Sequence, residues 1–141
     1  MKKIIVIVPA YNEEKTIKEV INRMPKFDDA EIELRVVVVD DGSSDRTGKL
    51  ASEAGATVLT HVKNQGLGKT FRDGLTYCFE NNADIMVNID ADLQYDPQDI
   101  RKLIQPILED KADFVTADRF KSEDCKLVRP ANMPKIKFWG N

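Results

Sequence analysis

The chain has 141 residues, of which 42% are hydrophobic and 32% charged, and its formal net charge is −3. This length predicts one domain with one buried core, and the composition excludes a disordered or low-complexity protein. The longest apolar runs, Ile4 to Val8 and Val36 to Val39, are too short to span a bilayer, and no signal-like segment follows the first residues. We therefore expect a cytoplasmic protein, and we expect no nucleic-acid partner.

Runs of β-branched residues bounded by turn residues predict strands that are buried on both faces, as in parallel sheets. Five such runs are Lys3–Pro9, Glu33–Val39, Thr57–His61, Ile85–Ile89 and Asp113–Ala117. Segments with helical periodicity lie between them at Glu13–Met24, Asp45–Ala54, Gly68–Asn81 and Asp96–Glu109. This alternation predicts an α/β fold, in which right-handed crossovers build a mostly parallel sheet with helices on both faces.

Parallel sheets of this kind bind ligands outside the carboxyl ends of their strands. The segments that follow the five predicted strands read PAYNEE, DDGSSD, HVKNQG, DADLQ and DRFK. They are the parts of the sequence richest in functional side chains, so we expect the site to lie there. The single histidine, His61, is interpreted as a loop residue rather than as a ligand.

The stretch from Gly66 to Thr70 ends in Gly-Lys-Thr, as a P-loop does. A P-loop also needs a glycine five positions before Gly68, where this chain has Lys63, and it normally follows the first strand of the sheet rather than the third. We therefore interpret the stretch as the start of the third helix, where Lys69 is a weaker candidate for contact with a diphosphate.

The stretch NIDADLQYDP follows the fourth predicted strand. Asp90 and Asp92 flank a small residue, Ala91, so an extended backbone would point both carboxylates to one side. Gln94 adds a carbonyl oxygen two positions further on, whereas Asp96 fits better as the N-cap of the next helix. Mg²⁺ or Mn²⁺ takes such oxygen ligands and completes its shell with water and substrate phosphates. Taken alone, such a pair is equally typical of caps and turns.

A second acidic cluster, Asp40 and Asp41, follows a neighbouring predicted strand, and Ser44 or Asp45 is expected to cap the next helix. Two acidic strand ends side by side repel each other unless a cation or a hydrogen-bond donor lies between them. A nucleotide base and a metal-bound diphosphate would supply both. The two clusters together therefore predict a nucleotide site.

Five motifs occur along the chain in the order IVPAYNEE, VVDDGSSDRT, KNQGLGKTFRDG, NIDADLQYDP and ADRF. In their order and spacing they resemble glycosyltransferase family 2, the inverting nucleotide-sugar glycosyltransferases with the GT-A fold, over essentially the whole chain. DADLQ is similar to the branch that includes dolichyl-phosphate mannose synthases and related polyprenyl-phosphate glycosyltransferases. The resemblance implies a three-layer, Rossmann-like GT-A core over residues 1–120 that binds a GDP- or UDP-sugar.

The resemblance also implies a role for each residue that matches a motif. The nucleoside pocket would be lined by Pro9, Tyr11 and Glu13. The base would be contacted by Val39, Asp40 and Asp41. The metal diphosphate would be held by Asp90, Ala91 and Asp92, with Gln94 as a further ligand of Mg²⁺ or Mn²⁺. Arg119 would approach the donor or acceptor phosphate and, with Asp90 and Asp92, make up the catalytic set.

Inverting transfer is a displacement at the anomeric carbon in which a nucleoside diphosphate leaves. A polyprenyl-phosphate acceptor at a membrane surface is already anionic and needs no strong general base, whereas a sugar hydroxyl would need one. The late carboxylates Asp118, Glu123 and Asp124 form no recognisable base motif, and Asp118 replaces the small polar residue usual before the arginine. Two alternatives stay open: a nucleotide-sugar-binding domain without transfer activity, and another phosphate-binding α/β enzyme such as a nucleotidyltransferase.

The last 21 residues differ from the rest in charge. Residues 1–120 carry 22 acidic and 16 basic side chains, whereas residues 121–141 carry two acidic and five basic ones. This basic segment is either a solvated end or a surface for anionic lipid or a phosphate-bearing acceptor, and we expect it to begin a longer acceptor region. The apolar Phe138 and Trp139 would pack on such a missing segment, on a partner chain (a second copy included) or on a membrane.

Two cysteines, Cys78 and Cys125, lack the paired spacing of metal ligands. Cys78 lies in an apolar helical pattern. We therefore expect buried free thiols rather than a disulfide.

Overall fold

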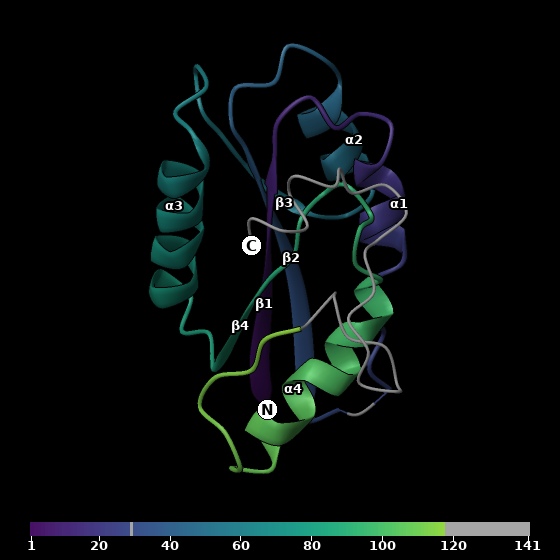
Figure 1. The fold of residues 1–141 in the computed structure, drawn as a ribbon, viewed down its shortest axis with the longest axis vertical. Helices are drawn as coiled ribbons and strands as arrows, with labels where there is room; N and C mark the ends of the chain where they lie inside the picture. Colours follow the sequence, from purple (N-terminus) through teal and green to yellow (C-terminus); the bar gives the residue numbers. More distant parts are fainter. Residues whose placement is uncertain (29, 118–141) are drawn as a thin grey trace, which may run out of the picture.

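The structure, a computed structural model, describes residues 1–28 and 30–117 (Figure 1). In chain order the strands are β1 (Lys2–Ala10), β2 (Ile32–Asp40), β3 (Thr57–Thr60) and β4 (Ile85–Asn88). The helices are α1 (Ile17–Asn22), α2 (Thr47–Glu53), α3 (Leu67–Glu80) and α4 (Ile100–Leu108), the last preceded by a 3-10 turn, η1 (Pro97–Asp99). The predicted alternation of strands and helices is confirmed.

The four described strands form one parallel sheet in the order β3-β2-β1-β4. Strand β1 is its centre, because it pairs with β2 over its whole length and with β4 through Ile4 to Ile7. Figure 1 shows α3 on one side of the sheet and α1, α2 and α4 on the other. The predicted layers, with helices on both faces, are therefore confirmed.

Both faces of β1 are buried, and successive residues face different cores. Ile4, Val6 and Val8 pack with buried residues of α1, α2 and α4, whereas Ile5 and Ile7 pack with Cys78 of α3. This explains why the strand is a continuous apolar run and lacks polar alternation. Cys78 is a buried free thiol, as expected, and its burial raises the pKa of the thiol; Cys125 lies outside the described residues.

Two predicted helices begin differently from the expectation. Residues 13–16 form a turn before α1, in which Thr16 and Ile17 N–H both donate to the Glu13 carbonyl. Before α4 the predicted N-cap is confirmed, because the Asp96 carboxylate accepts from Gln98 N–H at 3.0 Å. The 3-10 turn η1 lies between this cap and α4, where the sequence predicted continuous helix.

The fifth predicted strand, Asp113–Ala117, is wrong. These residues form no strand in the described structure, and Phe114 is largely exposed. A strand needs a hydrogen-bonding neighbour as well as β-branched residues. Among the described strands β4 pairs with β1 alone, so the run at 113–117 has no partner there. In the same part of the chain, no helix has the length and apolarity required to cross a membrane.

Gly74 of α3 makes a close helix-to-sheet contact that a substitution can test. A Cβ at this position would lie 2.6 Å from Cγ2 of Ile7, a fully buried residue of β1, whereas a Cβ at Gly68 of the same helix would meet no atom within 4 Å. We expect Gly74→Ala to lower the free energy of unfolding by about 2 kcal/mol, because neither the helix nor β1 can withdraw without losing packing.

Gly68→Ala is the matched control, and it should be neutral or stabilising by up to about 1 kcal/mol through helix propensity. Urea unfolding followed by circular dichroism measures both variants. Equal stability of the two would contradict the close packing of α3 on β1.

Candidate functional site

Parallel pairing brings the carboxyl ends of β1, β2 and β3 to one edge of the sheet. Ala10 of β1 pairs with Asp40 of β2, and Asp40 pairs with Thr60 of β3. Figure 1 shows the loops that follow these three strands together at the upper end of the sheet. The segments PAYNEE, DDGSSD and HVKNQG, distant in sequence, therefore form one surface.

The first two of these loops are joined by polar contacts. Asn12 N–H donates to Ser43 Oγ at 2.9 Å, and Asn12 Oδ1 accepts from Ser44 N–H at 2.9 Å. Glu13 N–H donates to Thr47 Oγ1 at 2.8 Å. Asn12 makes its two contacts from a left-handed conformation, φ 56°, which asparagine tolerates better than most residues. The contacts fix the loop after β1 against the start of α2.

The residues predicted to bind the nucleoside differ in their accessibility. Tyr11 is 49% exposed, whereas Pro9 and Glu13 are partly buried and Val39 is fully buried. The Glu13 carboxylate accepts from Thr16 Oγ1 at 2.9 Å. Of these four residues, Tyr11 is thus the one most open to a ligand.

Asp45 ends the β2 loop and sets the start of α2. Its carboxylate accepts from Thr47 N–H at 2.9 Å and from Thr47 Oγ1, and its other oxygen accepts from Glu14 N–H at 3.2 Å. Burial raises the pKa of Asp45, but these donors outweigh it and leave the pKa below its ordinary value. Neither expected residue is the N-cap, which is Arg46, but the Asp45 carboxylate directly before it holds the helix start through Thr47.

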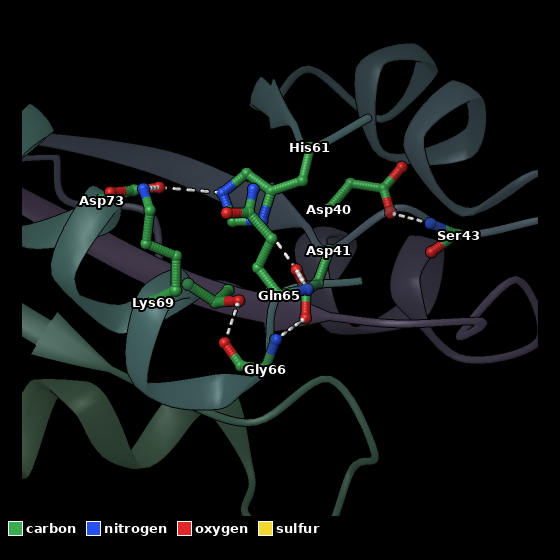
Figure 2. A network of polar contacts seen from close by, with 9 residues as sticks. Asp40, Asp41, Ser43, His61, Gln65, Gly66, Lys69 and Asp73 are labelled. Carbon is green, nitrogen blue, oxygen red and sulfur yellow. Dashed lines mark hydrogen bonds and ion pairs between the residues drawn. The ribbon is translucent and has the colours of Figure 1, made fainter. Parts of the chain in front are cut away.

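Asp40 and Asp41 are 5% and 4% exposed, and their carboxylates point in different directions (Figure 2). Asp40 accepts from Ser43 N–H at 3.0 Å and packs against Gly48, where a Cβ would lie 2.6 Å from its Oδ2. Asp41 accepts from Gln65 and Gly66 N–H, each at 2.8 Å. The two acidic strand ends are not neighbours as expected, because β1 lies between β2 and β4, and the chain's own backbone N–H groups are the donors to Asp40 and Asp41.

Asp41 also belongs to a network that the sequence did not reveal. The side chain of His61 is 9% exposed, and its Nδ1 lies 2.6 Å from Asp41 Oδ1. Its Nε2 lies 2.9 Å from Asp73 Oδ2, and Lys69 forms an ion pair with the same Asp73 carboxylate. Figure 2 shows the His61 ring between the two carboxylates. His61 follows β3 directly, as the expected loop residue, but its ring also bridges Asp41 and Asp73 of α3, which the sequence did not predict.

Both carboxylates of this network are held in the ionised form. Burial raises the pKa of Asp41, but the hydrogen bonds from His61, Gln65 and Gly66 outweigh it, and the pKa lies below its ordinary value. The Lys69 ammonium is the main cause of the lowered pKa of Asp73, with His61 contributing in the same direction. Lys69, the weaker candidate for a diphosphate contact, is therefore engaged by Asp73.

The carboxylates at the end of β4 have a different environment. Asp90 and Asp92 are exposed on either side of the buried Ala91, in a turn after β4 rather than in extended backbone. Asp92 Oδ1 accepts from Gln94 N–H at 3.0 Å. Leu93, between them, has φ 60°, a left-handed conformation that is costly for a leucine and that clusters at functional sites.

The oxygens of Asp90, Asp92 and Gln94 are candidate ligands for a divalent cation. Among the described residues, no three His, Cys, Asp or Glu side chains gather as a complete metal site would require. Two exposed carboxylates and the Gln94 amide oxygen nevertheless match the hard oxygen ligands of Mg²⁺ or Mn²⁺, which usually keeps water or phosphate in its shell. The donor set fits a cation that is shared with a phosphate-bearing ligand. Arg119, Asp118, Glu123 and Asp124 lie outside the described residues.

Comparison with known proteins identifies relatives of this chain. The model of the family described as glycosyl transferase family 2 matches residues 5–138. A UDP-N-acetylglucosamine–dolichyl-phosphate N-acetylglucosaminyltransferase of Methanococcus voltae is 37% identical to this chain over an alignment of 158 residues. The alignment covers 99% of this chain and 59% of that protein. A dolichol-phosphate mannosyltransferase of Pyrococcus furiosus is 35% identical over 84% of this chain and 33% of its own length. The chain thus spans about half, or less, of the curated relatives it matches.

Solved structures show the same architecture. Glucosyl-3-phosphoglycerate synthase from Mycobacterium tuberculosis superimposes with a TM-score of 0.63 and 30% identity, covering 76% of this chain and 40% of that one. That enzyme was solved with Mn²⁺, UDP and glucosyl-3-phosphoglycerate, and also with Mg²⁺ and UDP. The similarity confirms the expected GT-A-like arrangement.

The lowered pKa values predict how stability changes in acid. A carboxyl whose pKa is lowered by folding stabilises the protein above its unfolded value, here 3.8, and this stabilisation is lost as pH falls through the lower folded value. We expect Asp41→Asn to lower the free energy of unfolding at neutral pH by about 2 kcal/mol. Below about pH 4 the variant should lose less further stability than the wild-type chain.

Urea unfolding at a series of pH values measures this difference. Asp28→Asn, which neutralises an exposed carboxylate, is the control and should follow the wild-type curve. An unchanged acid dependence in Asp41→Asn would contradict the role given to the contacts of this carboxylate.

Proposed function

Because the chain belongs to glycosyltransferase family 2, we propose that it binds a nucleotide-sugar donor at the carboxyl edge of its sheet and transfers the sugar, with inversion, to a polyprenyl phosphate. The observation that carries this proposal is the exposed pair Asp90 and Asp92 at the end of β4, in a sheet whose other strand ends form one polar surface. The carboxylate oxygens of this pair are accessible to a cation or a ligand.

The nucleoside would bind between the ends of β1 and β2. Tyr11 offers an exposed aromatic ring on which a base can stack, and Glu13 lies beside it as the candidate for the ribose hydroxyls. Val39, Asp40 and Asp41 form the floor of this part of the site. We favour uridine over guanosine, because UDP is bound in the structures of the mycobacterial relative and the name of the Methanococcus relative contains UDP.

The diphosphate would bind at the end of β4, where Asp90, Asp92 and Gln94 would hold Mg²⁺ or Mn²⁺. When bound there, a divalent cation supplies positive charge where the departing nucleoside diphosphate gains negative charge. The carboxylates orient the diphosphate through it, and the left-handed turn at Leu93 keeps Asp92 and Gln94 at the surface. Arg119 is proposed to contact the donor or acceptor phosphate.

The acceptor assignment rests on the relatives and on chemistry. The Methanococcus and Pyrococcus relatives are named for dolichyl-phosphate acceptors. A phosphate monoester is anionic at neutral pH, so its oxygen attacks the anomeric carbon without a strong general base. Such an acceptor lies in a membrane, so we propose that the protein works at the cytoplasmic face. The basic segment 121–141, with Phe138 and Trp139, is a candidate for contact with that surface or with a partner chain.

Ligand-dependent stability tests the donor site. We expect UDP with Mn²⁺ to raise the melting temperature more than GDP with Mn²⁺, and UDP without metal to have little effect. Asp92→Ala should abolish the metal-dependent part. Asp99→Asn, which removes an exposed carboxylate 7 residues away in the sequence, is the control and should keep it. A metal-dependent shift that survives in Asp92→Ala would refute the metal assignment.

Product formation tests the transfer itself. With radiolabelled UDP-N-acetylglucosamine and a short polyprenyl phosphate, we expect a lipid-soluble labelled product with inverted anomeric configuration. Asp92→Ala should reduce the rate at least about a hundredfold through loss of charge stabilisation. Binding of UDP without any product would indicate a donor-binding domain, and stronger stabilisation by nucleoside triphosphates than by UDP would favour a nucleotidyltransferase.

A further inference from the structure

We propose that His61, in its doubly protonated form, is a positioning residue for the donor, and that it makes donor affinity fall as the pH rises. It would do so by tying the segment 62–66 to Asp41 at the end of β2. This inference rests on the proposed function, because it concerns the nucleoside part of that same site.

The geometry of the ring assigns its charge. Nδ1 lies 2.6 Å from Asp41 Oδ1, and Nε2 lies 2.9 Å from Asp73 Oδ2. A neutral imidazole has one N–H, so one nitrogen would present its lone pair to a carboxylate oxygen. Only the imidazolium can donate to both. The ring is nearly enclosed, at 9% exposure, so water does not easily replace a lost contact.

Protonation of Asp41 or of Asp73, in place of the His61 ring, is disfavoured. Asp41 already accepts two backbone N–H groups, which stabilise its anion, and Asp73 is paired with Lys69. The pKa of each carboxyl is accordingly lowered. The remaining proton therefore belongs to His61.

The charges around the ring balance only when His61 is protonated. Asp41 faces it from the end of β2, and Asp73 and Lys69 face it from α3. The nearby Asp40 carboxylate is directed away from the ring toward Ser43 (Figure 2). Two anions then match two cations, whereas with a neutral ring Asp41 would keep its two backbone N–H donors but lose its cationic partner.

His61 shares the Asp41 carboxylate with the segment that follows it. Asp41 Oδ1 accepts from both His61 and Gln65 N–H, while Oδ2 accepts from Gly66 N–H at the start of α3. The same segment packs closely on the β2 loop, because a Cβ at Gly42 would lie 2.5 Å from the carbonyl carbon of Lys63. Loss of the His61 contact would leave Asp41 with two backbone donors instead of three partners and would loosen this edge of the proposed nucleoside pocket.

The sharpest test replaces the carboxylate on the far side of the ring. In Asp73→Asn an amide N–H can donate to an unprotonated Nε2, so His61 no longer needs a second proton to satisfy both neighbours. We measure the dissociation constant of UDP with Mn²⁺ by titration calorimetry from about pH 6 to about pH 8. The wild-type affinity should fall about tenfold over this range, while that of Asp73→Asn should stay nearly constant.

Two further variants complete the test. His61→Ala removes the tie and should bind UDP about tenfold more weakly at low pH, with the pH dependence lost. Glu53→Gln removes a carboxylate that forms a similar i,i+4 ion pair with Lys49 on α2, and it should keep the wild-type profile. A wild-type affinity that is independent of pH, or an Asp73→Asn profile that equals the wild-type one, would overturn the proposal.

A readout that needs no donor separates this inference from the proposed function. Nitrogen-15 NMR of the imidazole should show protons on both ring nitrogens at about pH 6 in the wild-type chain. The Gln65 and Gly66 amides should exchange faster as the ring loses its second proton. A singly protonated ring at about pH 6 would overturn the charge assignment. Absence of UDP and GDP binding, beside a doubly protonated ring, would instead overturn the proposed function and the positioning role with it.

Discussion

The parallel pairing of β1 between β2 and β4 is the constraint on which the rest of the structure depends. A strand that is covered by helices on both faces can be made only of apolar residues, and Ile4 to Val8 meet that requirement without exception. Because all its neighbours run in the same direction, every polar segment that follows a strand is delivered to the same edge. The fold therefore separates its two tasks: the strands supply stability, and the segments after them supply chemistry.

The acidic residues at this edge divide into two kinds. Asp40, Asp41 and Asp45 are engaged by backbone and side-chain donors of the chain itself, and they hold the loops in place. Asp90 and Asp92 lie exposed around a buried alanine, where a ligand can reach them. The two kinds differ in exposure: the buried carboxylates hold loops, whereas the exposed pair, of which Asp92 also accepts from Gln94 N–H, is the one proposed to bind a cation.

Much of the fold could be predicted because its cause is local. Continuous β-branched runs, helical periodicity and the Asp96 cap each depend on a few neighbouring residues, and β1 to β4 were found in this way. The run at 113–117 shows the limit of such patterns, since β-propensity cannot report whether a partner strand is present. The turn before α1 likewise involves a distant residue, since Glu13 N–H donates to Thr47, 34 residues away.

The His61 network could not be predicted either, because it also depends on contacts between residues distant in sequence. It changes the interpretation of Lys69 in the Gly-Lys-Thr stretch. Its contacts join residues 12 and 20 positions apart on three elements, and no spacing in the sequence marks them. Lys69 and Asp73 are one helical turn apart, but from the sequence Lys69 was a weaker candidate for contact with a diphosphate at the start of the third helix. In the structure this lysine instead compensates Asp73, which in turn holds the His61 ring. A basic residue near the proposed nucleotide site can thus act indirectly, through the groups that it positions.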